Sequence, residues 1–184
     1  LHRTAEVAGC LGAIPAAVTF DDHPKTFVGN KTVSLINTPE DRGWLMKTEY
    51  GIQDVILLPF DRSMMEMPWD VFVKNILVGR FCAVHVVAGH DYRFGYKGEG
   101  NPEKLKQLCG ELGIGCDIIE KVEMDGITIS STYIRGLLEN GNVEEATRFL
   151  GHPHVLSGQV VRGRQVGRTI GIATPASLHN TIGV

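Results

Sequence analysis

Two serines, a threonine and an arginine stand together in the stretch Ile129–Arg135. A short β-like run precedes it and apolar residues at helical spacing follow it, which predicts a strand running into a helix. Ser130, Ser131 and Thr132 would then lie at a helix N-terminus, where N–H groups and the helix dipole favour anions. The guanidinium of Arg135, one turn later, could reach the same phosphate. The alternative is an ordinary capped helix with a surface arginine.

Asp21 and His23 form a second candidate group, directly after the apolar run 16–20. That run predicts a buried parallel strand. The two side chains would therefore lie at the carboxyl edge of a sheet, where open α/β folds bind their ligands. A polar loop with a turn proline, Pro24, remains the alternative.

A third group follows the apolar run 83–88, in the stretch Gly89–Gly95. The two end glycines allow unusual backbone angles and close approach of a ligand. Between them lie an acid, aromatic rings and a cation, a mixture that suits a planar, charged ligand. Asp91 and Phe94 are the candidate contacts, and Arg93 is left open between a structural and a functional role. A simple turn remains the alternative.

Strands and helices are expected to alternate along the chain, which predicts a parallel sheet flanked by helices. The chain changes character after about residue 153, where glycines recur every few residues without a helical period, as in an all-β segment. Two domains are therefore expected, 1–153 and 154–184. The expected helices are 1–11, 38–51, 68–78, 102–112, 132–139 and 143–150, and the expected strands are 16–20, 54–60, 83–88, 116–120 and 122–129.

Composition narrows the class of protein. The 184 residues carry a net charge of -3, which gives no basic field for nucleic acid. No apolar run is long enough for a membrane span, and no secretory signal opens the chain. The four cysteines are scattered, which favours buried or half-buried free thiols in the reducing cytosol, and hence a cytoplasmic protein.

The order of these motifs resembles the prokaryotic bifunctional FAD synthetase family, which joins riboflavin kinase to FMN adenylyltransferase. The resemblance implies a Rossmann-like nucleotidyltransferase domain with a parallel sheet, followed by the start of an all-β riboflavin-kinase barrel. It covers nearly the whole chain. The matching stretches are 19–24, 89–95, 129–135, 141–146 with 150–151, and 158–163 with 167–171.

The resemblance also implies an activity and roles for residues. FMN would attack the α-phosphorus of ATP to give FAD and pyrophosphate, with Mg²⁺ as charge partner, and a companion kinase would phosphorylate riboflavin. The implied catalytic residues are His23, Asp21 and Arg135. The nucleotide would be bound by Ser130, Ser131, Thr132 and Arg135, the flavin by Gly89, Asp91, Phe94 and Gly95, and the kinase substrates by Gly163, Gly167, Arg168, Gly171 and Thr174.

Two departures from the family pattern matter. The family has a first strand with an F-D-G-x-H-x-G-H-like motif before the helix at which this sequence begins, and its kinase module has a P-T-A-N motif where 172–177 differ in order. Either the chain is a fragment, or disordered segments are missing from the sequence as given, and the second interpretation is preferred. Two rival functions remain: a nucleotidyltransferase for a nicotinamide or pantetheine phosphate, and a non-catalytic flavin-binding module. A homo-oligomer is also left open.

Overall fold

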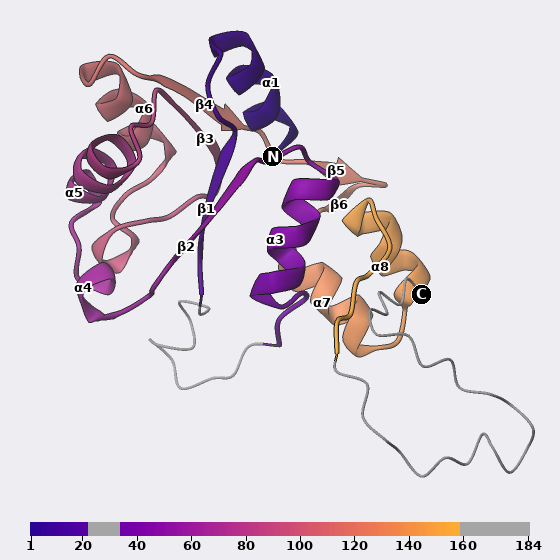
Figure 1. The fold of residues 1–184 in the computed structure, drawn as a ribbon. Coiled ribbons are helices and arrows are strands. Elements are labelled where there is room, and N and C mark those ends of the chain that lie inside the picture. Colours follow the sequence, from indigo (N-terminus) through magenta and orange to yellow (C-terminus); the bar gives the residue numbers. More distant parts are fainter. Residues whose placement is uncertain (22–33, 159–184) are drawn as a thin grey trace, which may run out of the picture. The chain divides into compact units, whose positions relative to one another are not determined.

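The computed structural model describes residues 1–21 and 34–158 of the chain (Figure 1). Helices and strands alternate through most of this range, as the sequence predicts. The elements are α1 His2–Leu11, β1 Ala16–Phe20, α3 Pro39–Thr48, β2 Asp54–Leu58, α4 Arg62–Met65, α5 Trp69–Val71, η1 Phe72–Arg80, β3 His85–Gly89, η2 Tyr96–Gly98, α6 Pro102–Glu111, β4 Gly115–Ile119, β5 Glu123–Met124, β6 Ile127–Thr128, α7 Ser131–Glu139 and α8 Val143–Leu150.

The chain divides into two compact units. The first comprises Leu1–Ser34 and Gly43–Ile129, and the second comprises Leu35–Arg42 and the chain from Ser130 onward. This division differs from the expected boundary near residue 153. The expected 154–184 domain lies almost entirely outside the described residues, so that boundary stays a prediction.

The first unit contains two pairs of parallel strands (Figure 1). β1 pairs with β2 from Ala16 opposite Asp54 to Phe20 opposite Leu58. β3 pairs with β4 from His85 opposite Gly115 onward. Parallel pairs joined through helices confirm the α/β class. The predicted barrel falls outside the described residues.

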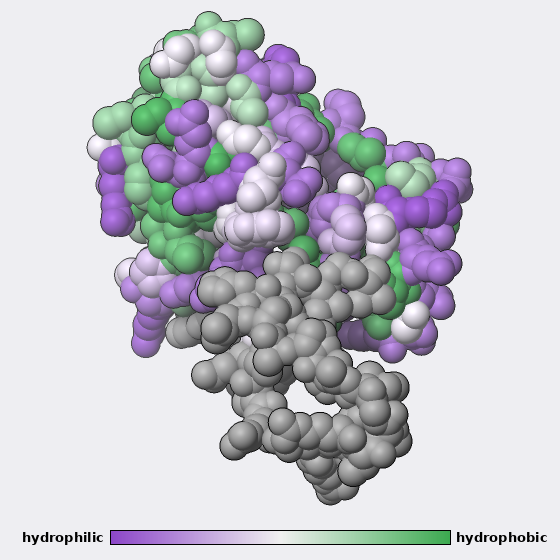
Figure 2. All heavy atoms as spheres, turned by 45° about the vertical axis from the view of Figure 1, so that its right-hand side comes forward, coloured by the Kyte–Doolittle hydropathy of each residue, from purple (hydrophilic) through white to green (hydrophobic). Residues whose placement is uncertain are grey.

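The expectation that strand 16–20 is buried holds for only part of it. Ala17 is buried, but Val18 on β1 and Leu57 on β2 are 38% and 48% exposed. Val18 lies opposite Ile56 and Leu57 lies opposite Thr19, so the two exposed side chains are on opposite faces of the pair. Each face is therefore only partly covered by the described residues. Figure 2 shows hydrophobic residues at the surface, side by side with hydrophilic ones.

Two local predictions need correction. The expected single strand 122–129 is a short antiparallel hairpin of β5 and β6. Asp125 and Gly126 between them both have positive φ, 53° and 75°, as a two-residue type I′ turn requires. The expected helix 68–78 begins as α5 but continues as η1, a π-helix. Hydrophobic spacing predicts a helix there without distinguishing its winding.

The core of the first unit is formed by strand, loop and helix residues together. Leu58, Phe72, Val73 and Phe94 form one buried cluster with the apolar face of α6, which contributes Leu105, Leu108 and Cys109. Asn101 caps α6 by accepting a hydrogen bond from the N–H of Lys104 at 2.8 Å, and Pro102 occupies the first turn. The helix that packs against β3 and β4 therefore has a clear start signal in its sequence.

All four cysteines are free, as predicted, but their burial was predicted wrongly for two of them. Cys10 and Cys82 are exposed, whereas Cys109 is buried and Cys116 half-buried. Burial, with the neighbouring Cys116, raises the pKa of Cys109 to about 12. Cys109 is therefore a packing residue rather than a nucleophile.

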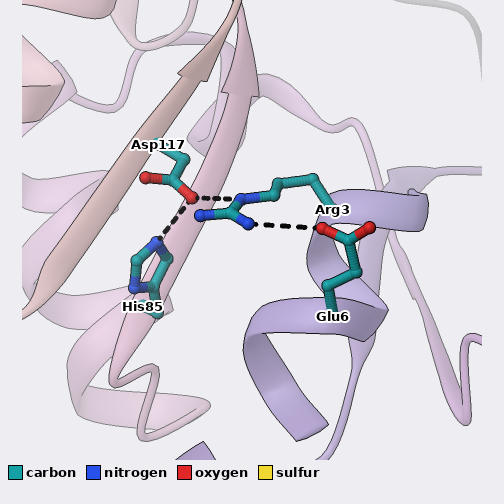
Figure 3. A network of polar contacts seen from close by, with 4 residues as sticks. All are labelled: Arg3, Glu6, His85 and Asp117. Atoms are coloured by element: carbon teal, nitrogen blue, oxygen red, sulfur yellow. Dashed lines mark hydrogen bonds and ion pairs between the residues drawn. The ribbon is translucent and has the colours of Figure 1, made fainter. Parts of the chain in front are cut away.

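A network of polar contacts links α1 to the parallel strands β3 and β4 (Figure 3). Arg3 on α1 donates from Nε to Oδ2 of Asp117 on β4 at 2.7 Å, and from Nη1 to Glu6 at 3.2 Å. The Nε2 atom of His85 on β3 lies 3.5 Å from the same Asp117 oxygen. The hydrogen bond from Arg3 is the main reason why the pKa of Asp117 is lowered.

Because the folded-state pKa of Asp117 is lowered, its contribution to stability is present above the ordinary carboxyl pKa and is lost as pH falls through the folded value. We expect Asp117→Asn to unfold at lower urea concentration than the wild type at pH 7, with a gap that narrows below about pH 4. Glu6→Gln is the control, because Glu6 pairs with the same arginine at an exposed site. Urea unfolding at both pH values measures the effect, and a gap independent of pH would contradict it.

The second unit is built on α7 and α8, which pack through the rings of Tyr133 and Phe149 at 4.9 Å. Hydrogen bonds join the segment after α8 to the segment before α3. Val155 O accepts from Asn37 at 3.3 Å, and a ring nitrogen of His154 lies 2.8 Å from Ile36 O. Ser157 donates to the carboxylate of buried Asp41. Although burial opposes ionisation, this bond and one from Thr38 leave the pKa of Asp41 lowered.

Candidate active site

A cavity of about 580 Å³ opens in the first unit. Its walls are mainly aromatic rings and methionine side chains, and its size falls in the range of ordinary small-molecule sites. The lining residues are Phe20, Phe60, Met64, Met65, Met67, Phe72, Tyr92, Arg93, Phe94, Gly95, Tyr96, Lys97 and Gly98.

Residues at or just after strand ends form much of the cavity wall. Phe20 is the last residue of β1 and Phe60 follows β2 by two residues, with their rings 5.0 Å apart in an edge-to-face arrangement. The stretch 92–98 follows β3. The cavity therefore lies beyond the carboxyl ends of parallel strands, where α/β folds bind ligands.

Phe94 is the centre of the aromatic wall. It is 7% exposed, belongs to the core cluster and also lines the cavity. Its ring stacks on Tyr92 at 5.2 Å and 17°, and meets Trp69 edge-on at 6.5 Å. The outer ring, Tyr92, is exposed, so this stack offers a flat apolar surface to a planar ligand.

Gly95 fixes the loop that carries these rings. It has φ 73°, and a Cβ there would lie 2.6 Å from the backbone nitrogen of Trp69. The next residue, Tyr96, donates its N–H to Met67 O at 2.6 Å. The loop is thus held against Met67 and against Trp69, the first residue of α5, and only glycine fits its point of closest approach.

Lys97 is a cavity residue that sequence reasoning missed. Its φ of 52° places it in the left-handed region, which lysine rarely adopts and which costs about 1 kcal/mol or more. Its ammonium lies 5.1 Å from the centre of the Tyr96 ring. The only signal in the sequence was its place in a glycine-punctuated loop.

Asp21 lies where the sequence places it, at the carboxyl edge of β1. Its backbone N–H donates to Leu58 O at 3.1 Å, and its Oδ1 accepts from the N–H of Phe60 at 3.1 Å. The carboxylate therefore joins the ends of β1 and β2 and helps to place Phe60 in the cavity wall. His23, its predicted partner, lies outside the described residues.

The predicted flavin contacts divide into two pairs. Phe94 and Gly95 line the cavity, whereas Gly89 and Asp91 are not among its lining residues. Gly89 ends β3, and a Cβ on it would lie 3.4 Å from Oδ1 of Asp91. Asp91 is exposed beside the turn in which Tyr92 N–H donates to Gly89 O at 3.1 Å.

The predicted nucleotide-binding residues begin α7 in the second unit. Ser130 is the cap residue, and its hydroxyl oxygen accepts from the N–H of Tyr133 at 3.2 Å. Ser131 and Thr132 are exposed in the first turn, and Arg135 is half-buried one turn later. The capped-helix alternative thus describes Ser130 correctly, while the neighbouring hydroxyls remain accessible to an anion.

The predicted kinase site cannot be located in the described residues. The kinase-module residues Gly163, Gly167, Arg168, Gly171 and Thr174 lie outside the described range. Within 1–21 and 34–158, no group of three or more potential metal-ligating side chains occurs. In the same part of the chain, no helix is both long and apolar enough to cross a membrane.

An aromatic cavity at the carboxyl edge of parallel strands, in a chain that also has a hydroxyl-rich helix start, is typical of nucleotide-binding α/β proteins. Comparison with known proteins makes the class specific. The pattern of the FAD synthetase family matches residues 1–133. The chain therefore belongs to the FAD synthetase family and contains its nucleotidyltransferase domain.

Individual relatives agree with this assignment. The chain is 35% identical to the bifunctional riboflavin kinase/FMN adenylyltransferase of Listeria monocytogenes over 95% of its own length and 55% of the relative's. The protein of the same name from Haemophilus influenzae is 32% identical over 95% and 56%. The chain thus spans about half the length of these relatives. A crystal structure described as a macrolide-efflux protein from Streptococcus pneumoniae matches with a TM-score of 0.77 and 29% identity, over 92% of this chain and 56% of that one.

Proposed function

We propose that this chain transfers the adenylyl group of ATP to FMN, giving FAD and pyrophosphate. The observation that carries the proposal is the aromatic cavity beyond the ends of β1, β2 and β3, in a chain of the FAD synthetase family. Its volume and flat Tyr92–Phe94 stack suit an isoalloxazine ring.

The reaction needs little covalent chemistry from the protein. A phosphate oxygen of FMN attacks the α-phosphorus of ATP in line, the bond from that phosphorus to the bridging oxygen of the β-phosphate breaks, and pyrophosphate leaves. Positioning the two anions and stabilising charge at the α-phosphorus therefore supply most of the catalysis.

The residue roles follow from this chemistry. We assign Ser131, Thr132 and Arg135 to the ATP phosphates, because the start of α7 offers free N–H groups, two exposed hydroxyls and a cation. Ser130 would stabilise the first turn of α7 as its N-cap residue. Phe94 and Gly95 would hold the flavin, while Gly89 and Asp91 would shape the turn that carries the aromatic stack.

Asp21 and His23 complete the proposed catalytic group. The hydrogen bond that Asp21 accepts from the N–H of Phe60 supports a positioning role for this carboxylate. The role of His23 rests on the resemblance alone. Mg²⁺ is proposed only as the counter-ion of the ATP phosphates, since the described residues provide no cluster that would hold it as a resident metal.

A companion riboflavin kinase activity is the second part of the proposed function. It rests on the names of the bifunctional relatives and on the resemblance of residues 158–171 to the opening of a kinase barrel. On this basis residues 1–153 would form the adenylyltransferase and residues 154–184 would begin the kinase.

The direct test is to incubate the 184-residue protein with FMN, ATP and Mg²⁺ and to follow FAD and pyrophosphate by chromatography. We expect equal amounts of both products. A parallel sample with riboflavin in place of FMN tests the kinase, which would be shown by FMN or FAD. Bound flavin without any FAD from FMN would reject adenylyl transfer and leave the flavin-binding alternative.

A further inference from the structure

Two cations line an otherwise apolar cavity. Of the thirteen residues that form its wall, Arg93 and Lys97 are the charged ones, and no carboxylate is among them. Cations beside stacked aromatic rings suit a ligand with a planar body and an anionic group. This charge pattern is not needed to bind a neutral flavin.

Two acidic side chains in the segment after β2 are engaged by groups outside the cavity wall. Asp61 accepts a hydrogen bond from Ser63 at 2.6 Å and caps α4, and Asp70 pairs with Lys74 at 3.1 Å. Within the described part of the chain, neither Arg93 nor Lys97 forms an ion pair. The two positive charges are therefore available to a ligand in the cavity.

The loop holds Lys97 in place at the cavity. Gly95 and Tyr96 are fixed against the Met67–Trp69 segment, and the N–H of Gly98 donates to Gly95 O at 3.0 Å. The left-handed φ of Lys97 would suit glycine better, yet a lysine stands there. A cation in a strained conformation at a binding cavity points to a role in binding.

We infer that Lys97, with Arg93 as the second cation, recognises the phosphate of the flavin and so makes the cavity prefer FMN to riboflavin. The inference rests on the proposed function, because it takes the cavity as the flavin site. Riboflavin has the same ring system without the phosphate. A phosphate contact therefore affects the two ligands differently, whereas a general packing role affects both alike.

The test is equilibrium binding of FMN and of riboflavin to the full chain without ATP. Quenching of the flavin fluorescence measures the binding. Lys97→Gly removes the charge and suits the backbone, so it keeps the fold. We expect this variant to bind FMN at least about tenfold more weakly and riboflavin within about twofold of the wild type. Lys97→Arg should restore most of the FMN affinity, and Lys106→Ala, on the exposed side of α6, should change neither.

The salt dependence of flavin affinity is a second test of the phosphate contact. Added KCl should weaken FMN binding to the wild type more than riboflavin binding, because it screens the phosphate contact. The inference is overturned if Lys97→Gly leaves FMN binding unchanged or weakens both ligands equally. A wild-type protein that binds neither flavin would instead contradict the proposed function itself.

Discussion

Replacing Gly95 with alanine is expected to destabilise the protein by about 2–4 kcal/mol. The left-handed backbone at φ 73° costs an alanine about 1 kcal/mol. The new methyl group would also lie 2.6 Å from the backbone nitrogen of Trp69, and forcing such overlap costs about 1–3 kcal/mol more. Because backbone rather than a flexible side chain is in the way, the loop must move.

Gly98→Ala is the matched control for this prediction. Gly98 lies in the same loop with φ 68°, but its nearest neighbour, Cβ of Arg93, would be an ordinary 3.5 Å away. It should lose only about 1 kcal/mol. Urea unfolding of both variants measures the difference, and flavin binding should fall with Gly95→Ala. Equal losses in the two variants would show that the close approach to Trp69 is not a real constraint.

Removing the guanidinium of Arg135 should lower kcat/KM for FAD formation by about a hundredfold to a thousandfold. A cation that stabilises charge developing on the transferred phosphate is typically worth this much. FMN affinity in the absence of ATP should stay near the wild-type value, since Arg135 is assigned to the nucleotide. The measurement is steady-state kinetics of Arg135→Ala with varied ATP, beside a flavin titration.

Arg148→Ala provides the comparison for this effect. Arg148 lies on α8 in the same unit and pairs with Glu145 at 3.0 Å near the surface. Its loss should change activity by less than about twofold, since surface ion pairs contribute little. The assignment of Arg135 fails if the two variants have the same kcat/KM, or if Arg135→Ala loses activity only because it has unfolded.

Local signals predicted most of the fold. Short-range patterns of residues, whose physical cause lies within a few residues, place α3, α6 and α8 near the expected ranges 38–51, 102–112 and 143–150. β1 and α8 were predicted with their observed bounds. The π-winding of η1 was missed, because a hydrophobic period does not distinguish five-residue from four-residue hydrogen bonds.

The cavity was harder to predict, since its wall joins parts of the chain that are distant in sequence. The glycine pair around Asp91 indicated a binding loop, and Phe94 and Gly95 do line the cavity. Met64 and Met67 also line the cavity, but they lie in and just after α4 and were not among the predicted site residues. Lys97 was missed because only its backbone conformation and neighbours distinguish it from other exposed lysines.

Asp61 is a second case in which sequence position alone does not identify a residue's role. Its position after β2 resembles that of Asp21, and both follow strand ends. The structure shows that Asp61 caps α4, whereas Asp21 joins two strand ends beside the cavity. Position after a strand does not distinguish the two residues, and only the tertiary contacts separate a helix cap from a residue beside the cavity.

The most direct test of the central claim is the fate of labelled phosphorus. The protein would be incubated with FMN and ATP labelled at either the α- or the γ-phosphorus, and the flavin and pyrophosphate fractions would be separated. Adenylyl transfer predicts that the α-label appears in FAD and the γ-label in pyrophosphate. An α-label that stays in ATP or its hydrolysis products, with no labelled flavin, would contradict the proposed function.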